Sequence, residues 1–303
     1  MSVQITTAFV EQYKANVYHL LQQKGSRLRP YVRQESVTGR NAYFEQIGPT
    51  SARLRTSRHS DTPRMDTPHA RRRVSLADYD WADMIDNEDK VRMLINPASE
   101  YAQAAMWAMG RAMDDAIISA FDGSAFTGVD GSTSTSYDSS MTIAVNTVWP
   151  GVTSADTGLN LAKLIEARRV LGQNDVDPDE EVFAAVNARQ ISSLLKDERV
   201  VSGDYNSALP LVNGQISRIG GVTLIPCNRI TVDSNSDDEV PYWTRSGMLL
   251  ALGQDMTTRI SERDDKNYAT QVFCSMIIGA TRMEERRVGV ILCDPGASPI
   301  TDV

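Results

Sequence analysis

Residues 97–122 restrict the possible folds of this chain more than any other stretch. Their sequence, PASEYAQAAMWAMGRAMDDAIISAFD, consists mostly of strong helix formers and is interrupted only by Gly110. Asn96 suits the N-cap, Pro97 suits the first helical position, and Gly123 suits the residue just past the end. We therefore predict a single helix of about 26 residues, which would be a rod about 39 Å long.

The two faces of this helix differ. One broad apolar stripe at helical spacing is the expected packing face. It holds Ala98, Tyr101, Ala102, Ala105, Met106, Met109, Ala112, Met113, Ala116, Ile117 and Ala120. The opposite face carries Glu100, Gln103, Trp107, Arg111, Asp114 and Ile118. Two interpretations stay open for this mixed face, a partly covered surface helix or a helix covered by another chain. The acidic and basic residues along it exclude a membrane span.

Charge is distributed unevenly along the chain. The whole sequence of 303 residues has an ordinary globular composition and a net charge of −8, which argues against a general nucleic-acid binder. Residues 24–75 nevertheless hold twelve basic and four acidic residues. This segment is +8, so the rest of the chain is −16. Such asymmetry favours pairing of basic and acidic surfaces between copies.

Residues 41–77 are predicted to form a long hairpin. NAYFEQI and RRVSLA are strand-like, and the region between them holds three prolines and almost no large apolar residue. A segment of this kind cannot build a core, so it is either a disordered loop or an arm that projects from the subunit. The hairpin carries Arg53, Arg55, Arg58, Arg64, Arg71, Arg72 and Arg73.

The remaining chain alternates between helical and strand-like patterns. Residues 1–40 are predicted to be an arm, with an amphipathic helix over 9–21 that docks on its own body or on a neighbour. A short helix is expected over 86–94, and a Ser/Thr/Gly-rich loop over 124–141. Residues 142–240 resemble an α/β lobe, and residues 241–294 are rich in strands. The pattern predicts an α+β protein in which a long helix lies on a sheet and a second lobe is inserted.

No catalytic constellation is present in the sequence. Nucleotide-binding, nucleophile-elbow and zinc-protease motifs are missing, and we expect no enzyme activity, no cofactor and no metal. His59 and His69 both lie in the basic hairpin, and we interpret them as solvated loop residues. Asp233, Asn235 and Asp237 have part of a calcium-loop spacing, but Asp238 replaces the required Gly, so a solvated turn is the preferred interpretation. Three cysteines without CxxC spacing indicate reduced core thiols.

Residues 58–86 and 95–121, taken in this order with the arm, the α/β lobe and the closing strands, resemble the major capsid proteins of tailed bacteriophages. That family shares the Hong Kong 97-type fold. By this resemblance, 1–40 would be the N-terminal arm and 41–76 the extended loop. Residues 77–141 and 241–303 would form the peripheral domain, and 142–240 the axial domain. Since no lysine lies between Lys24 and Lys90, no cross-linking residue is carried over from the family.

The resemblance implies a structural function. Copies of the chain would form pentamers and hexamers of an icosahedral virion shell around phage double-stranded DNA, assembled in the bacterial cytoplasm. A separate scaffolding protein, a portal and a decoration protein are the expected partners, with little specific contact to DNA and no membrane. The alternatives are an encapsulin-like compartment shell that holds enzyme cargo and, in a different class, an α/β enzyme.

The expected subunit interface joins the basic hairpin of one copy to the mixed helix face of another. On the helix, the residues expected to take part are Trp107, Arg111, Asp114, Asp115 and Ile118. On the hairpin, they are the seven arginines from Arg53 to Arg73.

Overall fold

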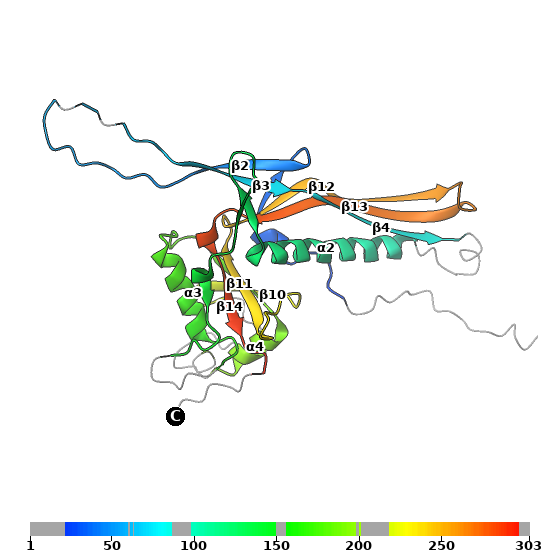
Figure 1. Ribbon diagram of the computed structural model, residues 1–303. Coiled ribbons are helices and arrows are strands. Elements are labelled where there is room, and N and C mark those ends of the chain that lie inside the picture. The colour runs from blue at the N-terminus through cyan, green and yellow to red at the C-terminus, as the bar shows by residue number, and fades with distance from the viewer. Residues whose placement is uncertain are drawn as a thin grey trace, which may run out of the picture. The chain divides into compact units, whose positions relative to one another are not determined.

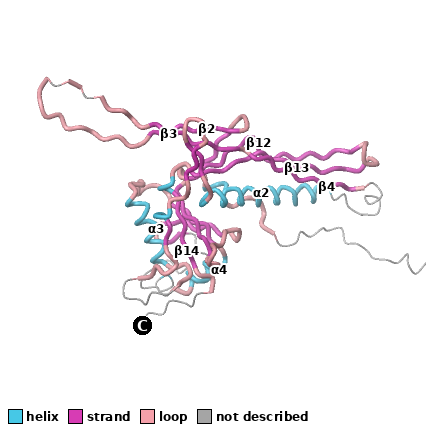
Figure 2. Tube along the Cα trace, viewed as in Figure 1, coloured by secondary structure: helices cyan, strands magenta, loops and turns pink. Residues whose placement is uncertain are grey.

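The computed structural model describes residues 22–59, 61–62, 64–86, 98–149, 156–197, 200 and 218–296. The chain divides into two compact units (Figures 1 and 2). The first comprises Met1–Ser26, Asp78–Ala112 and Gln254–Ile277, and the second comprises Arg27–Ala77, Met113–Gly253 and Ile278–Val303. The helix predicted over 9–21 lies outside the described residues, as does the helix predicted over 86–94 beyond its first residue.

The long helix is confirmed as α2, Ala98–Asp122. Its expected N-cap and first residue, Asn96 and Pro97, lie outside the described residues. In the first unit, Tyr101 and Ala102 of α2 pack on a small core built from Ile85 and Val272. The apolar face of α2 therefore covers a sheet, as the sequence pattern indicates.

That sheet has four strands in the order β1-β12-β13-β4. Their bounds are β1 Arg33–Ser36, β4 Ala77–Ile85, β12 Met248–Arg263 and β13 Ala269–Arg282. β1 pairs parallel to the first part of β12, from Arg33 opposite Leu249 to Ser36 opposite Leu252. β12 is one continuous strand where the sequence predicts two separate runs, over 248–252 and 257–263. The sequence does not show that the two runs form one strand, because the residues between them are polar and an exposed strand needs no apolar alternation.

A six-stranded sheet in the second unit has the order β7-β14-β11-β8-β10-β9. The strand bounds are β7 Thr142–Ile143, β8 Val182–Val186, β9 Arg218–Ile219, β10 Val222–Pro226, β11 Asp238–Thr244 and β14 Val288–Cys293. The helices α3, Leu161–Gln173, and α4, Ala188–Leu195, begin at Asn160 and Asn187, whose side chains accept hydrogen bonds from backbone N–H groups of the first turn. Both helices contribute to the main hydrophobic core on one face of this sheet.

The strands of this sheet come from separated parts of the sequence. β14 lies within the range 241–303, and β11 begins at Asp238, whereas the axial domain is expected to end at residue 240. The domain boundaries given in the sequence analysis stay a prediction. On the opposite face, Trp243 of β11 contacts Phe121 of α2, with ring centroids 4.8 Å apart. The end of α2 is thereby packed on the sheet within the second unit.

The hairpin forms a third sheet with the order β2-β3-β5-β6. The bounds are β2 Asn41–Ile47, β3 His69–Ser75, β5 Ala125–Thr127 and β6 Thr133–Thr135. β2 and β3 pair antiparallel over their full length, from Asn41 opposite Ser75 to Ile47 opposite His69. β5 and β6 lie in the region that was expected to be a loop. The sequence does not reveal them, because three-residue strands rich in Ser and Thr give little periodic signal.

Short 3-10 helices complete the described elements: η2 Arg29–Tyr31, η3 Ser139–Met141 and η4 Glu285–Arg287. Helices and largely antiparallel sheets share the chain, so the predicted α+β class is confirmed. Among the described helices, none has the length and apolar character needed to cross a bilayer.

Candidate assembly interface

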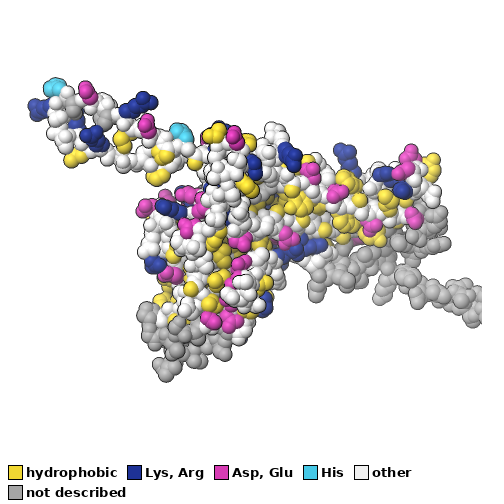
Figure 3. All heavy atoms as spheres, viewed as in Figure 1, with side chains coloured by type: hydrophobic (Ala, Val, Ile, Leu, Met, Phe, Trp, Pro, Cys, Tyr) yellow, Lys and Arg dark blue, Asp and Glu magenta, His cyan; other side chains and the backbone are white. Residues whose placement is uncertain are grey.

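The described residues of the loop between β2 and β3 make almost no contact with their own unit. Its two ends are tied together by a hydrogen bond from Gly48 N–H to Pro68 O of 2.9 Å. Beyond this closure the described loop residues are exposed, including Arg53, Arg55, Arg58 and Arg64, and Leu54 is 83% exposed. The outstretched segment with dark-blue side chains in Figure 3 is this loop. An exposed surface of this kind is available to another molecule.

Few bonds stabilise the loop from within. Arg55 Nε donates to Ser57 O at 3.1 Å, and Arg64 lies 3.6 Å from Asp66 in a pair that is almost fully exposed. Exposed pairs of this kind contribute little to stability. Four exposed arginines therefore remain accessible to a partner surface.

The three consecutive arginines of β3 point in alternate directions, as residues of a strand must. Arg71 and Arg73 lie on one face, where Arg71 pairs with Glu45 and Arg73 stacks on the Phe126 ring at 4.5 Å. Arg72 points the other way and is buried. It is closed off from any neighbour, contrary to the expectation that all three arginines face an interface.

The hairpin register brings these groups together. Glu45 lies opposite Arg71 in the β2–β3 ladder, and Tyr43 lies opposite Arg73. Tyr43 also lies under the Arg71 guanidinium, which is 5.6 Å from its ring centroid. Glu45 and Tyr43 support the hairpin itself, and pairing the two seven-residue strands end to end would have predicted these contacts from the sequence.

The mixed face of α2 is occupied by residues of the same chain. In the first unit, Arg111 Nη1 donates to Gln22 Oε1 and to the Gln23 carbonyl at 2.9 and 3.2 Å. The Lys24 ammonium lies 5.5 Å from the centroid of the Trp107 ring. Of the two interpretations of this face, the structure supports a helix partly covered by its own chain at these positions.

Gly110 explains how the chain approaches so closely. A Cβ atom at this position would lie 2.5 Å from the backbone carbon of Gly25, well inside van der Waals contact. The single glycine within the helical pattern therefore marks the point where two backbones of the first unit meet.

In the second unit, Asp114 and Ile118 are buried, contrary to the expectation that they lie on an open face. The Asp114 carboxylate accepts hydrogen bonds from the backbone N–H groups of Arg27 and Leu28 at 3.0 to 3.2 Å. Neither side chain is available to a neighbour, because Asp114 caps its own chain and Ile118 lies in the subunit interior. The sequence offers no signal that Asp114 is buried, since an aspartate at helical spacing among charged residues is typical of a solvated face.

Asp115 is exposed and pairs with Arg229 through a two-pronged contact. The hydrogen bond to Asp115 raises the pKa of the Arg229 guanidinium. Asp115 therefore has a partner in its own subunit. The interface roles of Trp107, Arg111, Asp115 and the exposed arginines stay predictions.

Replacing Trp107 with Ala is expected to lower the stability of the isolated subunit by about 1 kcal/mol, because the ring loses its contact with Lys24 and part of its burial. Thermal melting of the soluble subunit measures the change. Met106→Ala is the matched control, since Met106 directly precedes Trp107 in the helix and its side chain is exposed. An unchanged melting temperature for the Trp107 variant would contradict coverage by the subunit's own chain.

No described group of three or more His, Cys, Asp or Glu side chains could hold a metal ion. The Asp233 carboxylate accepts hydrogen bonds from the N–H groups of Asn235 and Asp237, so its oxygen atoms close their own turn. Lys163 is fully buried and donates to the carbonyls of Thr157 and Leu292, which ties α3 to β14. Burial lowers the pKa of this lysine. Asp233 and Lys163 therefore stabilise the fold of the subunit.

The whole chain is similar to phage capsid proteins. A family model described as phage capsid protein matches residues 5–295. No curated protein matches the chain. Among solved structures, the capsid of cyanophage P-SCSP1u is similar with a TM-score of 0.75 at 15% identity, covering 96% of this chain and 94% of that one.

Two further capsid structures show the same fold. The cyanophage Pam1 capsid has a TM-score of 0.70 at 16% identity, with 96% of this chain and 98% of that chain covered. The capsid of a native GTA particle has a TM-score of 0.65 at 12% identity, covering 93% and 94%. At these identities the solved structures show only that the fold is shared. Membership of the family rests on the family model, which matches the sequence.

Proposed function

This chain belongs to the phage capsid protein family, and from that membership we propose that its copies assemble through pentamers and hexamers into an icosahedral shell around phage double-stranded DNA. The protein has the Hong Kong 97-type fold and a structural role in the capsid. We further propose that this role involves no catalysis, that assembly takes place in the bacterial cytoplasm, and that a scaffolding protein, a portal and a decoration protein are separate chains.

The exposed loop between β2 and β3 is the observation that carries the assembly proposal. It presents four arginines and the apolar side chain of Leu54 with no surface of its own unit to cover them. Ordering a long exposed segment on binding costs conformational entropy, which contacts with another copy would offset. Repetition of such contacts around closed rings would hold a shell together even if each one is weak.

An acidic surface suited to these arginines lies on β4. Asp78 and Asp80 are exposed on one face of this strand together with Met84, which is 43% exposed, and Asp83 is exposed on the opposite face. By comparison, the α2 face has lost Asp114 and Ile118 to the subunit interior. We therefore place the acceptor surface for a neighbour's loop on β4, and the exposed Asp115 of α2 is a separate candidate contact.

Particles purified after expression of the full chain, alone and with its neighbouring genes, test the proposal. Electron microscopy is expected to show closed shells of uniform diameter. Nucleic acid inside the native particles supports the phage capsid role, whereas enriched enzyme cargo would favour the compartment-shell alternative. A chain that stays monomeric under every condition contradicts the proposal.

Reversing the loop charge is expected to reduce the yield of closed shells at least about tenfold, since like charges across an interface cost several kcal/mol. The variant replaces Arg53, Arg55, Arg58 and Arg64 with Glu. A matched variant with Lys at the same four positions keeps the charge and is expected to assemble. Subunit melting should be unchanged in both, because the replaced side chains are exposed. Normal shells from the Glu variant would contradict the electrostatic docking.

A further inference from the structure

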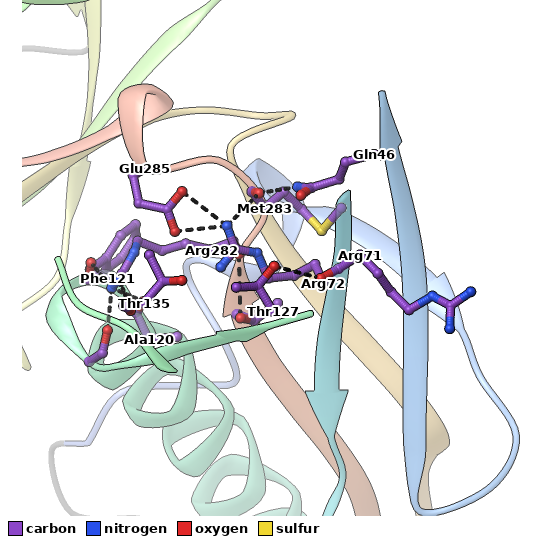
Figure 4. Close-up of polar contacts among 12 residues, drawn as sticks. Gln46, Arg71, Arg72, Ala120, Phe121, Thr127, Thr135, Arg282, Met283 and Glu285 are labelled. Atoms are coloured by element: carbon purple, nitrogen blue, oxygen red, sulfur yellow. Dashed lines mark hydrogen bonds and ion pairs between the residues drawn. The ribbon is translucent and has the colours of Figure 1, made fainter. Parts of the chain in front are cut away.

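Arg72 connects the base of the loop to a different part of the second unit. Its Nη2 atom donates to Glu285 Oε1 and Oε2 at 2.7 and 3.0 Å, and to the Met283 carbonyl at 3.2 Å. Gln46, on the partner strand of the hairpin, donates to the same Met283 carbonyl. Figure 4 shows both side chains converging on the segment that follows β13. Both strands of the hairpin are therefore bonded to residues 283–285.

That segment is itself anchored through its neighbour Arg282. The Arg282 side chain is completely buried, and its Nη1 atom donates to the carbonyls of Phe121 at 2.8 Å and of Ala120 at 3.3 Å, and to Gly123. These carbonyls lie at the C-terminus of α2, where backbone acceptors lack partners and carry partial negative charge. The loop base, residues 282–285 and the helix end thus form one continuous polar connection within the second unit.

Glu285 is the central member of this connection. In the described part of the chain, it supplies the sole carboxylate bonded to Arg72, whose Nε and Nη1 atoms have no acceptor. Two buried guanidinium groups are therefore influenced by one carboxylate: Arg72 is bonded to Glu285, and Arg282 feels its charge. Burial lowers the pKa of the Arg282 guanidinium, and Glu285 acts in the opposite direction. Neutralising Glu285 would leave buried positive charge without compensation.

Other contacts also hold the hairpin at its base. Val74 lies in a small apolar core with Leu249, Ala251 and Met283, and Thr127 Oγ1 donates to the Arg71 carbonyl at 2.9 Å. The ladder between β3 and β5 contains only two residue pairs, Arg72 with Thr127 and Arg73 with Phe126. All of these contacts lie at the base, so a change in one of them can alter the direction in which the exposed part of the hairpin leaves the unit. Each leg of the loop has roughly 10 residues and spans up to about 33 Å, so a swing of about 10° would displace the tip by about 6 Å.

We propose that the Arg72–Glu285 ion pair sets the direction in which the loop leaves the subunit, and thereby the diameter of the shell that the copies build. This inference rests on the proposed function. The loop tip must meet a surface on another copy, so a small change of direction at the base alters the angle between neighbouring subunits. Arg72 and Glu285 act as positioning residues and touch no neighbour themselves.

Glu285→Gln tests the proposal, with Glu45→Gln as the matched control. Glu45 pairs with the adjacent arginine of the same strand, Arg71, but this pair is exposed and joins only β2 to β3. Wild-type protein is assembled first, and a failure at that stage would overturn the proposed function rather than this inference. Shell diameters are then measured by electron microscopy, and subunit melting is recorded in parallel.

The Glu285 variant is expected to give a folded subunit whose shells have a broad or shifted distribution of diameters, with at least a tenfold loss of shells of wild-type diameter. Glu45→Gln is expected to give wild-type diameters. Shells of unchanged diameter from Glu285→Gln, even in reduced yield, would show a purely stabilising role and overturn the proposal. If Glu285→Gln does not fold, Glu285→Asp keeps the charge on a shorter side chain. Altered diameters from Glu285→Asp support the proposal, and unchanged diameters or a second failure to fold overturn it.

Discussion

A chain that lacks Ser51–Thr67 is expected to form no closed shells and to melt within about 2 °C of the complete subunit, since exposed loop residues contribute little to stability. The deletion is compatible with the fold because Gly48 and Pro68 are already hydrogen-bonded to each other. The remaining residues can therefore close the hairpin without moving β2 or β3. Circular dichroism measures the subunit, and electron microscopy with sedimentation measures assembly.

A second variant separates the loop's sequence from its length. Replacing Ser51–Thr67 with a Gly/Ser linker of equal length keeps the span but removes the arginines and Leu54. This variant is also expected to fail to assemble. The linker still connects β2 to β3, but the side chains that would contact a neighbouring copy are gone. Normal shells from either variant would show that the loop is dispensable, and unfolding of the deletion variant would show that the loop belongs to the subunit's own core.

Arg282→Met is expected to reduce the free energy of unfolding of the subunit by about 4 kcal/mol, the largest loss expected from a single substitution described here. Methionine fills much of the same volume but donates no hydrogen bond, so the carbonyls at the end of α2 become buried without a donor. The loss is partly offset because the buried guanidinium no longer has to be stripped of water. Chemical denaturation of the soluble subunit measures the change.

Arg286→Met is the control for Arg282, because Arg286 is exposed and lies four residues further along the chain. Its effect is expected to stay within about 0.5 kcal/mol. Arg282→Lys keeps the charge and one donor position, so it should fall between the two. If Arg282→Met is as stable as the wild type, the cap at the end of α2 contributes nothing net, and desolvation of the guanidinium cancels its hydrogen bonds.

The three consecutive arginines of β3 occupy different environments in the subunit. Arg71 and Arg73 remain on the accessible face of β3, where they stack on Tyr43 and Phe126. Arg72 enters the subunit and meets Glu285. The period of two along a strand produces this separation, and it means that the three arginines will respond differently to the same substitution.

The sequence by itself determined the elements whose signal is local. The α2 helix follows from helix propensity, and the exposed basic hairpin follows from the lack of apolar residues between its two strands. The order of these elements, together with the amino-acid sequence of residues 58–86 and 95–121, was also sufficient to indicate the capsid family. Local patterns of this kind survive because they depend on neighbours within a few positions.

Only the tertiary structure decided which charged residues are accessible. Asp114 and Arg72 look solvated in sequence, but each finds its partners far along the chain, at Leu28 and Glu285 respectively. A buried charge is tolerated only where bonds from distant segments converge on it, and no local pattern encodes that convergence. Gly110 shows the same limit, since its helical position was readable from the sequence but its reason, the close approach of Gly25, lies in the packing of two separate stretches of chain.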